Sequence, residues 1–571
     1  MDILGVNLTR TSTGTDLYDG AAVLLRDGVP MVAIAEERLT RAKHCGSVQQ
    51  ASQYCLDAMG TDIRSVDYVA VSICCEVPPP ADWAAHSLRL QGLDVRDDQV
   101  VVVPSHHLSH AASAFLASPY QQAITVVADN EGNILGPRTR HEYWLNSLER
   151  TTVWACTSGS GTEIRRIASH GDQPDEISLG AAYNYITKWL GFSSYHDAGQ
   201  TMALAAHATG KWRDSRLFEW EEGRLRCRLP QRHDAKVEAV TDWLTAEFGI
   251  SLDQGRDPGE PISDLHHEVA GLAQSALERA LLDLVRRAVE ETGIRTVCLA
   301  GGTALNCVAN HRIARELDLD GLFIQPAASD VGQALGNALW TWHRLLGQPR
   351  RWAMKSAALG RPYGAAEIRA AAEGYGAHID VEPSPDVVGA VASRLAQGQI
   401  VGWFSGGSEY GIRALGQRSI LGDPRRRETK TRLDLEIKCR EAFRPYAPSV
   451  TAESASEWFD LTDREIAPGA PATFMLQAAP VRRHLRFRIP AVVHVDGTAR
   501  VHVVHPGQDA DYHALIERFR QLTGIPVLLN TSFNAAGNPI VETPGDAIAE
   551  FLAMGLDCLV LDGLLITPRR R

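Results

Sequence analysis

The pattern of apolar and polar positions predicts alternating strands and helices over the first 345 residues. Three short apolar runs predict strands, at Ile3–Val6, Ala21–Leu25 and Met31–Ala35. Asp27-Gly28 between the last two runs favours a hairpin. Apolar residues at helical spacing predict helices over Ser178–Leu190 and His267–Glu291. This alternation is typical of an α/β fold.

A change of pattern divides the chain. Residues 346–362 are rich in Pro, Gly and basic residues without periodicity, which predicts a linker. Beyond it a helix at Ala365–Ala372 and a strand at Ile400–Phe404 restart the alternation. Since 571 residues are too many for one core, we expect two domains, 1–345 and 363–571. Strand–glycine-turn patterns in both halves of the first domain suggest an internal duplication.

Composition excludes several classes of protein. The chain is 44% hydrophobic and 22% charged, as in ordinary soluble proteins, and no apolar run is long enough to span a membrane. Without a signal peptide, we expect a cytoplasmic protein with no membrane partner. A net charge of −12 argues against nucleic acid as a partner. The ten cysteines include no C-x-x-C pair, which excludes zinc ribbons and favours reduced thiols.

Four residues could build one metal site. His106 and His110 are four apart, so on a helix both imidazoles share a face. Asp129 ends one apolar run and Asp330 follows another, and strand ends are where α/β sheets bind ligands. Such a mixed set suits iron(II), manganese or zinc better than calcium. The alternatives are a chance histidine pair on a surface helix and Asp330 as a helix N-cap.

Two further groups indicate binding of phosphates. The predicted strand Thr296–Ala300 runs into Gly301-Gly302, and Asn306 follows. Such a turn lets backbone amides approach a nucleotide; the alternative is that it is only a tight connection. Beyond the linker the acidic chain concentrates cations and orienting polar groups. Arginine forks and lysine match phosphate oxygens, the alternative being a solvated arginine-rich face. These residues are Arg413, Arg418, Lys438, Arg444, Arg500, Ser532 and Asn534.

Eight motifs in this order resemble the O-carbamoyltransferases of the NodU/CmcH/TobZ type over nearly the whole chain. They are HHLSHAASAF, SLGAAYNYITKWLGF, LAGGTALNCVANHRI, PAASDVGQALGNAL, ALGQRSILGDPR, IKCREAFRPYAPSV, HVDGTARVH and LLNTSFN. The resemblance implies an actin-like N-terminal domain (the ASKHA fold, a duplicated RNase H-like unit) and a YrdC-like α/β C-terminal domain.

The same resemblance implies a two-stage activity. The C-terminal domain would convert carbamoyl phosphate and ATP, with Mg²⁺, into carbamoyladenylate. The N-terminal domain would transfer the carbamoyl group to a hydroxyl of a small-molecule acceptor, as in antibiotic biosynthesis. The four metal candidates would hold iron(II), Gly301, Gly302 and Asn306 the nucleotide, and the basic group carbamoyl phosphate and ATP. Lys438 and Arg444 would act directly on these anions. The acceptor stays open, as does a homodimer.

One departure from the family concerns the base that activates the acceptor. Related sequences carry His-Asp where this chain has Tyr18-Asp19. An ordinary phenol titrates near ~10 and is a poor base at neutral pH, so Asp19 is the better candidate. On a strand the two side chains would point to opposite faces, whereas the polar run 11–16 favours a loop. Two further departures are Gly406-Gly407 and Gly199-Gln200, where the family carries Gly-Arg and Gly-Lys.

Three rival functions remain. A threonylcarbamoyl-adenosine-type tRNA modification enzyme would share both folds, but the acidic charge and the order of the modules disfavour it. A hydrogenase-maturation carbamoyltransferase would bring an acylphosphatase segment and C-x-x-C pairs, which this sequence lacks. A non-catalytic nucleotide-binding regulator is disfavoured because all four metal candidates and Lys438 are present.

Overall fold

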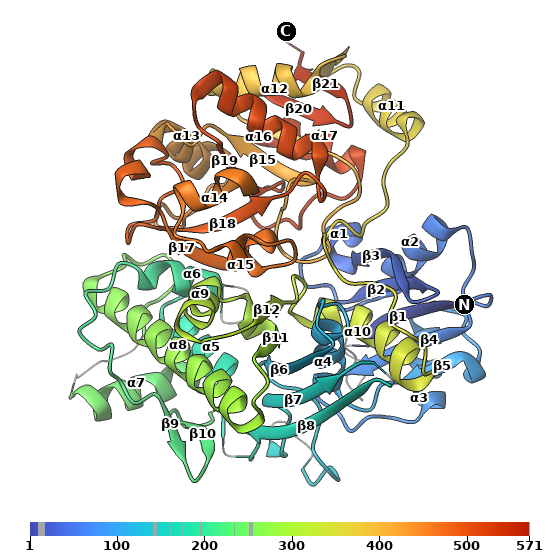
Figure 1. Cartoon of the computed structure of the whole chain (residues 1–571), viewed down its shortest axis with the longest axis vertical. Coiled ribbons are helices and arrows are strands. Elements are labelled where there is room, and N and C mark those ends of the chain that lie inside the picture. Colours follow the sequence, from blue (N-terminus) through green and yellow to red (C-terminus); the bar gives the residue numbers. More distant parts are fainter. Residues whose placement is uncertain are drawn as a thin grey trace.

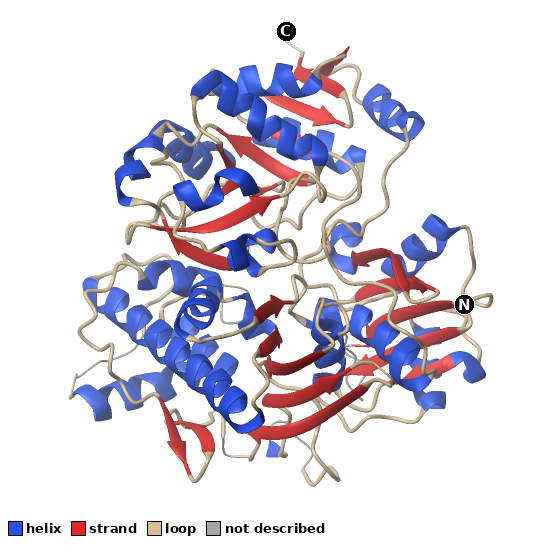
Figure 2. Ribbon diagram, viewed as in Figure 1, coloured by secondary structure: helices blue, strands red, loops and turns tan. Residues whose placement is uncertain are grey.

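The computed structural model describes residues 1–8, 18–140, 145–159, 161–174, 176–193, 197–232, 234–249 and 255–569. Within these ranges the chain forms two five-stranded sheets, a two-stranded hairpin and a nine-stranded sheet. The five-stranded sheets lie together in the N-terminal half, and the nine-stranded sheet lies in the C-terminal half (Figures 1 and 2). No helix in this part of the chain has the length and apolar character needed to cross a membrane.

The first sheet has the strand order β3-β2-β1-β4-β5. Strands β1, β2 and β3 are antiparallel, while β4 and β5 run parallel to β1. The three strands predicted near the N-terminus are confirmed, each one to three residues longer than its apolar run. The bounds are β1 Asp2–Leu8, β2 Ala21–Arg26, β3 Val29–Ala35, β4 Tyr68–Ile73 and β5 Val100–Val102.

The second sheet repeats this topology. Its order β8-β7-β6-β11-β12 again joins three antiparallel strands to two that run parallel to the first. The predicted duplication is therefore confirmed, and it is consistent with the actin-like domain that the resemblance implies. The bounds are β6 Gln122–Ala128, β7 Thr151–Thr157, β8 Glu163–His170, β11 Thr296–Ala300 and β12 Gly321–Ile324.

Two helices in equivalent places pack between the sheets (Figure 1). Helix α4 (His106–Phe115) follows β5, and α10 (Gln333–Trp340) follows β12. They can approach closely because Gly336 lacks a side chain: a Cβ there would lie 2.0 Å from the carbonyl oxygen of Ser109. Gly5 plays the same part between β1 and α10, where a Cβ would meet the carbonyl of Ala334 at 2.0 Å.

Of the remaining N-terminal helices, α2, α3 and α8 contact strands of the two sheets, while α6 and α7 pack on other helices. Helix α8 confirms the long amphipathic helix that the sequence predicts, and α5 begins at the N-cap Ser178, whose side chain accepts a hydrogen bond from Ala181. The elements are α1 Glu36–Thr40, α2 Gln49–Met59, α3 Ala81–Leu90, α5 Leu179–Trp189, α6 Ala198–Ala205, α7 Lys236–Phe248, α8 Asp264–Thr292, α9 Cys307–Glu316, and the hairpin β9 Phe218–Glu221 and β10 Arg224–Cys227.

The nine-stranded sheet has the order β13-β21-β20-β14-β15-β19-β16-β18-β17 and its own buried apolar cluster. The assignment of this part as YrdC-like stays a prediction. Its strands are β13 Ile379–Pro383, β14 Val401–Phe404, β15 Arg418–Gly422, β16 Ala447–Thr451, β17 Gln477–Pro480, β18 Thr498–Val504, β19 Val527–Ser532, β20 Cys558–Leu561 and β21 Leu564–Pro568. Its helices are α11 Ala365–Gly374, α12 Val387–Ala396, α13 Arg427–Arg432, α14 Ala452–Trp458, α15 Asp463–Ile466, α16 Ala510–Thr523 and α17 Pro544–Met554.

The segment between the two halves is hydrogen-bonded to both of them. It holds no helix or strand from residue 346 to residue 364. The carbonyl of Leu359 nevertheless accepts a hydrogen bond from Ala33 of β3, and Gly360 donates to Ser408 in the C-terminal half. Tyr54 adds a direct contact between the halves, because its hydroxyl donates to the buried carboxylate of Glu542 at 2.7 Å. The segment is thus an ordered part of the contact between the halves.

Candidate functional site

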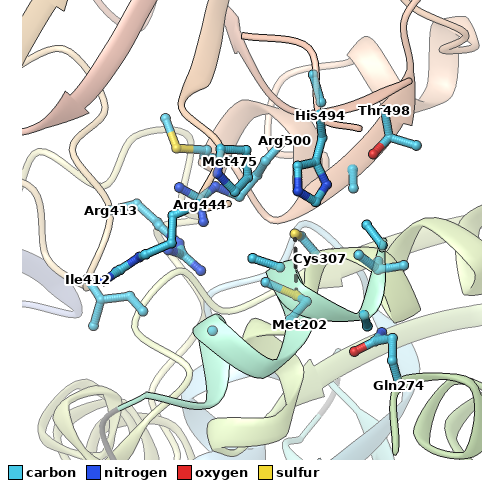
Figure 3. A pocket seen from close by; sticks show the side chains of 18 of the residues that line it. Met202, Gln274, Cys307, Ile412, Arg413, Arg444, Met475, His494, Thr498 and Arg500 are labelled. Carbon is cyan, nitrogen blue, oxygen red and sulfur yellow. Dashed lines mark hydrogen bonds between the residues drawn. The ribbon is translucent and has the colours of Figure 1, made fainter. Parts of the chain in front are cut away.

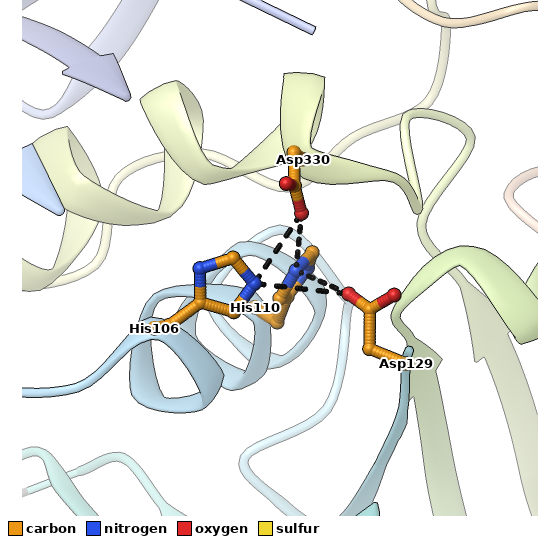
Figure 4. A group of neighbouring side chains, drawn as sticks. All are labelled: His106, His110, Asp129 and Asp330. Atoms are coloured by element: carbon orange, nitrogen blue, oxygen red, sulfur yellow. Dashed lines mark hydrogen bonds and ion pairs between the residues drawn. The ribbon is translucent and has the colours of Figure 1, made fainter. Parts of the chain in front are cut away.

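The four metal candidates meet between the two five-stranded sheets. His106 and His110 project from one face of α4, with ring centroids 4.9 Å apart. Asp129 follows β6, and Asp330 opens a short turn before α10. Figure 4 shows all four side chains pointing toward one point, and one ligand atom of each lies within 4.8 Å of the others.

The distances within this cluster suit a cation held among the four groups. Nε2 of His110 lies 3.0 Å from Oδ2 of Asp129 and 3.2 Å from Oδ1 of Asp330. Nε2 of His106 lies 3.3 Å from the same Asp330 oxygen and 3.8 Å from Asp129. The Asp129 Oδ2 atom is buried, and no described residue donates a well-oriented hydrogen bond to it. Two imidazoles and two carboxylates are a donor set for a divalent transition metal.

Electrostatics in the cluster follow from burial and opposite charge. Burial alone would raise the pKa of the Asp129 carboxyl, but contacts with His106 and His110 outweigh it and lower that pKa. Burial would likewise lower the pKa of His106, and the two carboxylates raise it well above its ordinary value. The side chain of Asp330 belongs to this cluster and caps no helix, since Ser329 occupies the N-cap position of the turn. The N-cap alternative for Asp330 is therefore wrong.

Sequence reasoning missed the polar groups around the cluster. Nε2 of Gln333 lies 3.0 Å from Oδ1 of Asp330 and 3.2 Å from Nε2 of His110. The other end of this amide accepts a hydrogen bond from Ser72, which in turn accepts one from Asn337. Gln333 is three residues after Asp330, so it shares a helical face with it, and that spacing was the available signal.

The glycine turn lies beside Asp129. Gly301 has a φ of +85°, and a Cβ at this position would lie 2.3 Å from the carbonyl oxygen of Ala128. The amide of Gly302 faces Oδ1 of Asp129 at 3.4 Å. Asn306 caps α9 through Ala309 and exchanges two amide hydrogen bonds with Gln274. Its side chain is therefore already engaged in holding α9 against α8.

A cavity of about 870 Å³ lies between the N-terminal and C-terminal halves. The N-terminal half contributes Met202, Gln274 and Cys307, which lie below the arginines in Figure 3. The C-terminal half contributes most of the predicted anion-binding residues. These are Arg413, Arg444, Arg500, Ser532 and Asn534, joined by Arg440, which sequence reasoning did not single out.

The arginines of this cavity form a buried cationic cluster. Burial and the neighbouring guanidiniums lower the pKa of Arg413, and Arg500 is affected in the same way. The Nε atoms of both are buried without a hydrogen-bond partner in the described ranges. Figure 3 shows Arg413, Arg444 and Arg500 converging on one region. Buried cations such as Arg413 and Arg500 favour an anionic ligand, whereas Arg444 already lies 3.7 Å from the Glu441 carboxylate.

Lys438 lies next to this cluster, at a second cavity that shares Arg444 and Ser532 with the first. Its ammonium donates to the carbonyls of Ser532 at 2.6 Å and Asn534 at 2.7 Å, and to the Asn534 side chain at 3.1 Å. Burial lowers the pKa of this lysine well below its usual value. The lysine thus holds the loop after β19, which carries two of the predicted phosphate ligands.

Arg418 is used differently from its neighbours in the sequence. It begins β15 opposite Phe404, and its guanidinium lies 3.5 Å from the centroid of that ring. It donates to the carbonyls of Ser405 and Gly406 at 3.0 and 3.1 Å. The structure therefore places Arg418 in a role that shapes the Gly406-Gly407 loop, apart from the other arginines.

Tyr18 and Asp19 lie just beyond a stretch, 9–17, that falls outside the described residues, so the predicted loop at 11–16 is not described. The Tyr18 side chain is exposed, and its neighbour Asp19 has a φ of +59°. Oδ1 of Asp19 lies 2.8 Å from Nδ1 of His44, a residue that sequence reasoning missed. His44 also lines the large cavity.

Comparison with known proteins gives the family. A family model described as "Carbamoyltransferase N-terminus" matches residues 81–339, and "Carbamoyltransferase C-terminus" matches residues 392–568. "Nodulation protein NolNO" of Sinorhizobium fredii is 35% identical over 97% of this chain and 80% of its own length. "Nodulation protein U" of Rhizobium tropici is 32% identical over all of this chain and 96% of its own. The chain therefore belongs to the carbamoyltransferase family. It is an enzyme that transfers carbamoyl groups.

One solved structure among the matches is full-length HypF in its phosphate- and nucleotide-bound form. It is 14% identical, with a TM-score of 0.35, and the match covers 59% of this chain and 55% of HypF. A likeness this distant carries no information on the activity of the present chain.

Proposed function

We propose that this carbamoyltransferase is an ATP-dependent O-carbamoyltransferase that works in two stages. Residues 363–571, a YrdC-like domain, form carbamoyladenylate from carbamoyl phosphate and ATP with Mg²⁺. Residues 1–345, an actin-like domain, transfer the carbamoyl group to a hydroxyl of a small-molecule acceptor. Residues 346–362 link the two domains. The observation that carries this proposal is the cavity between the two halves, in which the Nε atoms of Arg413 and Arg500 are buried without a hydrogen-bond partner among the described residues.

The first stage needs cations that hold two anionic substrates together. Water hydrolyses carbamoyl phosphate to carbamate and inorganic phosphate, and an oxygen of the carbamate then attacks the α-phosphorus of ATP and displaces pyrophosphate. Arg413, Arg444 and Arg500 are proposed to neutralise the phosphate oxygens, which otherwise repel one another. Lys438 supports Ser532 and Asn534 from behind, because its three donors are bonded to that loop.

The second stage joins the acceptor hydroxyl to the carbamoyl carbon and releases AMP. His106, His110, Asp129 and Asp330 fit a divalent transition metal, for which iron(II) is the proposed ion. When bound, such an ion supplies Lewis acidity to a carbonyl oxygen. Gly301 and Gly302 are proposed to present backbone amides to the adenylate phosphate, with Asn306 fixing the start of α9 behind them. A base must also take the proton of the hydroxyl, and the sequence nominates Asp19.

The shared cavity explains why both stages belong in one chain. Carbamate decomposes in water and carbamoyladenylate is a reactive mixed anhydride, so each must be kept from bulk water between its formation and its use. Residues from opposite halves, such as Met202 and Met475, line the cavity, so both domains are proposed to border the route between the two sites. The acceptor class stays open between antibiotic-type natural products, nucleosides and sugar chains.

The test is product analysis with the purified chain. Carbamoyl phosphate and ATP alone should yield pyrophosphate, and adding an acceptor should yield AMP and a product heavier by one carbamoyl group. A panel of an aminoglycoside, a macrolide, a cephem, a nucleoside and a sugar oligomer, read by mass spectrometry, identifies the acceptor class. Pyrophosphate release that requires tRNA would favour the tRNA-modifying alternative. Binding of ATP without any pyrophosphate or AMP would favour a regulator.

A further inference from the structure

His44 and Asp19 form a pair of the kind that activates hydroxyl groups in enzymes. The Nδ1 atom of His44 and Oδ1 of Asp19 are 2.8 Å apart, although the residues belong to different loops. Both side chains are partly accessible, at 29% and 18%. A histidine whose Nδ1–H is held by a carboxylate keeps its basic lone pair on Nε2, which is the tautomer a general base needs.

Backbone geometry fixes this pair in place. Both residues have positive φ values, +59° for Asp19 and +56° for His44. The carbonyl of Asp19 accepts a hydrogen bond from Asn7 of β1 at 2.8 Å, and the amide of His44 donates to Glu37 at 3.0 Å. Such left-handed conformations cost free energy in residues other than glycine, and they persist only where surrounding contacts hold them.

The pair also lies near the end of β1 that is connected by hydrogen bonds to the metal cluster. Val6 and Asn7 are neighbours at the end of β1: Asn7 binds Asp19, and the carbonyl of Val6 accepts a hydrogen bond from Asn337 at 2.7 Å. Asn337 continues through Ser72 to Gln333, whose amide touches the metal cluster. His44 itself lines the cavity that holds the arginine cluster.

We propose that His44 is the general base that activates the acceptor hydroxyl, and that Asp19 orients it. This inference rests on the proposed second stage and changes the assignment of the base from Asp19 to His44. It explains how a chain with Tyr18 in place of the family histidine keeps a base at this point: the imidazole comes from a later loop.

The acceptor oxygen forms a bond to the carbamoyl carbon while the bond from that carbon to the adenylate oxygen breaks, and AMP leaves with that electron pair. The hydroxyl proton passes to Nε2 of His44, and the resulting imidazolium is stabilised by the Asp19 carboxylate. Burial lowers the pKa of His44, but Asp19 more than compensates, so the net shift is upward. The other charged groups acting on this ring are Glu37 and Lys43.

The decisive variant is His44→Ala, studied in the full-length protein with carbamoyl phosphate and ATP. Water and the panel alcohols serve as acceptors, and pyrophosphate and AMP are measured separately. We expect AMP release to fall by about 10²-fold or more and pyrophosphate release to be unchanged. Added imidazole should restore AMP release, because it can occupy the vacated space and accept the proton. His86→Ala, on the exposed face of α3, is the matched control and should behave as wild type.

Each outcome bears on a different claim. Absence of pyrophosphate release from the wild type would contradict the proposed function itself. Normal AMP release by His44→Ala, or a loss that imidazole does not repair, would overturn the role of His44. The pairing is tested without any acceptor by an NMR titration of His44: Asp19→Asn should lower its pKa, and an unchanged pKa would overturn the orienting role of Asp19.

Discussion

His106 and Asp330 occupy equivalent places in the two repeats, each after the fifth strand of its sheet, and their Nε2 and Oδ1 atoms lie 3.3 Å apart. The duplication therefore brings two equivalent helix starts face to face, and the chain has placed a histidine on one and a carboxylate on the other. The metal site therefore has a mixed ligand set at these two positions, whereas identical repeats would have supplied the same residue type twice.

The metal cluster gives the first prediction. His110→Ala should reduce the metal content of the purified protein by at least about 10-fold, since even indirect partners of metal ligands change affinity by that much. Carbamoyl transfer should stop while pyrophosphate release continues. Elemental analysis measures the metal, with His86→Ala as the control. Full retention of metal in His110→Ala would contradict the assignment of these ligands.

Lys438 gives the second prediction. Lys438→Ala removes the donor to four oxygen atoms of Ser532 and Asn534, so the loop after β19 should lose its position. Pyrophosphate release should fall below detection, whereas transfer from supplied carbamoyladenylate should survive. Lys355→Ala, at an exposed position of the linking segment, is the control. Loss of both activities together would point to a folding defect.

The arginine cluster predicts opposite effects on stability and on ligand binding. Arg413→Met removes one of several buried, mutually repelling cations, so the free energy of unfolding without ligand should rise by about 0.5–2 kcal/mol. Pyrophosphate or ATP should then raise the melting temperature less than in the wild type, because a phosphate ligand is lost. Thermal melts with and without ligand measure both effects. Arg369→Met, on the surface of α11, should change neither.

Replacing Asp509 by asparagine should give a gain in stability that depends on pH. This N-cap of α16 accepts hydrogen bonds from Tyr512 and Gln417, and burial raises the pKa of its carboxyl from 3.8 to about 6. The ionised carboxylate is thus disfavoured in the folded state, and this destabilises the folded protein. The loss of stability is complete above pH 6 and absent below the pKa of the carboxyl in the unfolded chain. Asp509→Asn keeps the cap and should stabilise the protein by about 1–2 kcal/mol at pH 8 but not at pH 4.

Urea unfolding at the two pH values measures this difference. Asp511→Asn, two residues away and exposed, serves as the control. A gain of equal size at both pH values would show that the effect comes from helix propensity, with no contribution from the carboxyl group.

Tyr18 and Asp19 give the last prediction. Asp19→Asn should lower transfer by about 10²-fold or more with intact pyrophosphate release, since either base assignment needs this carboxylate. Tyr18→Phe should cost much less, because its phenol would only position the acceptor. AMP release with the panel alcohols measures both. A larger loss in Tyr18→Phe than in Asp19→Asn would show that the phenol does the proton work.

The sequence predicted those parts of the site that local rules determine. His106 and His110 follow from helical spacing, and Gly301 from the strand–turn–helix pattern. Both rest on a few consecutive residues. The contact of His110 with Asp330, 220 positions later, could be expected only because the chain resembles a family in which these motifs occur together.

Tertiary contacts determined the rest. Arg413 and Arg418 are five residues apart, yet one faces the cavity and the other stacks on Phe404, because β15 pairs with β14 at that point. His44 meets Asp19 only through the fold of two loops. No periodicity in the sequence identifies a partner such as His44. The sequence also does not distinguish an arginine that binds a ligand from one that binds a backbone carbonyl.

The segment that joins the halves has a consequence for protein engineering. Its backbone is hydrogen-bonded to β3 through Leu359 and to the C-terminal half through Gly360. A chimaera that exchanged whole modules at this segment to acquire another acceptor would have to preserve these backbone hydrogen bonds and the side-chain contact between Tyr54 and Glu542. Changes of acceptor should therefore be sought by replacing loops around the cavity, with the junction left native.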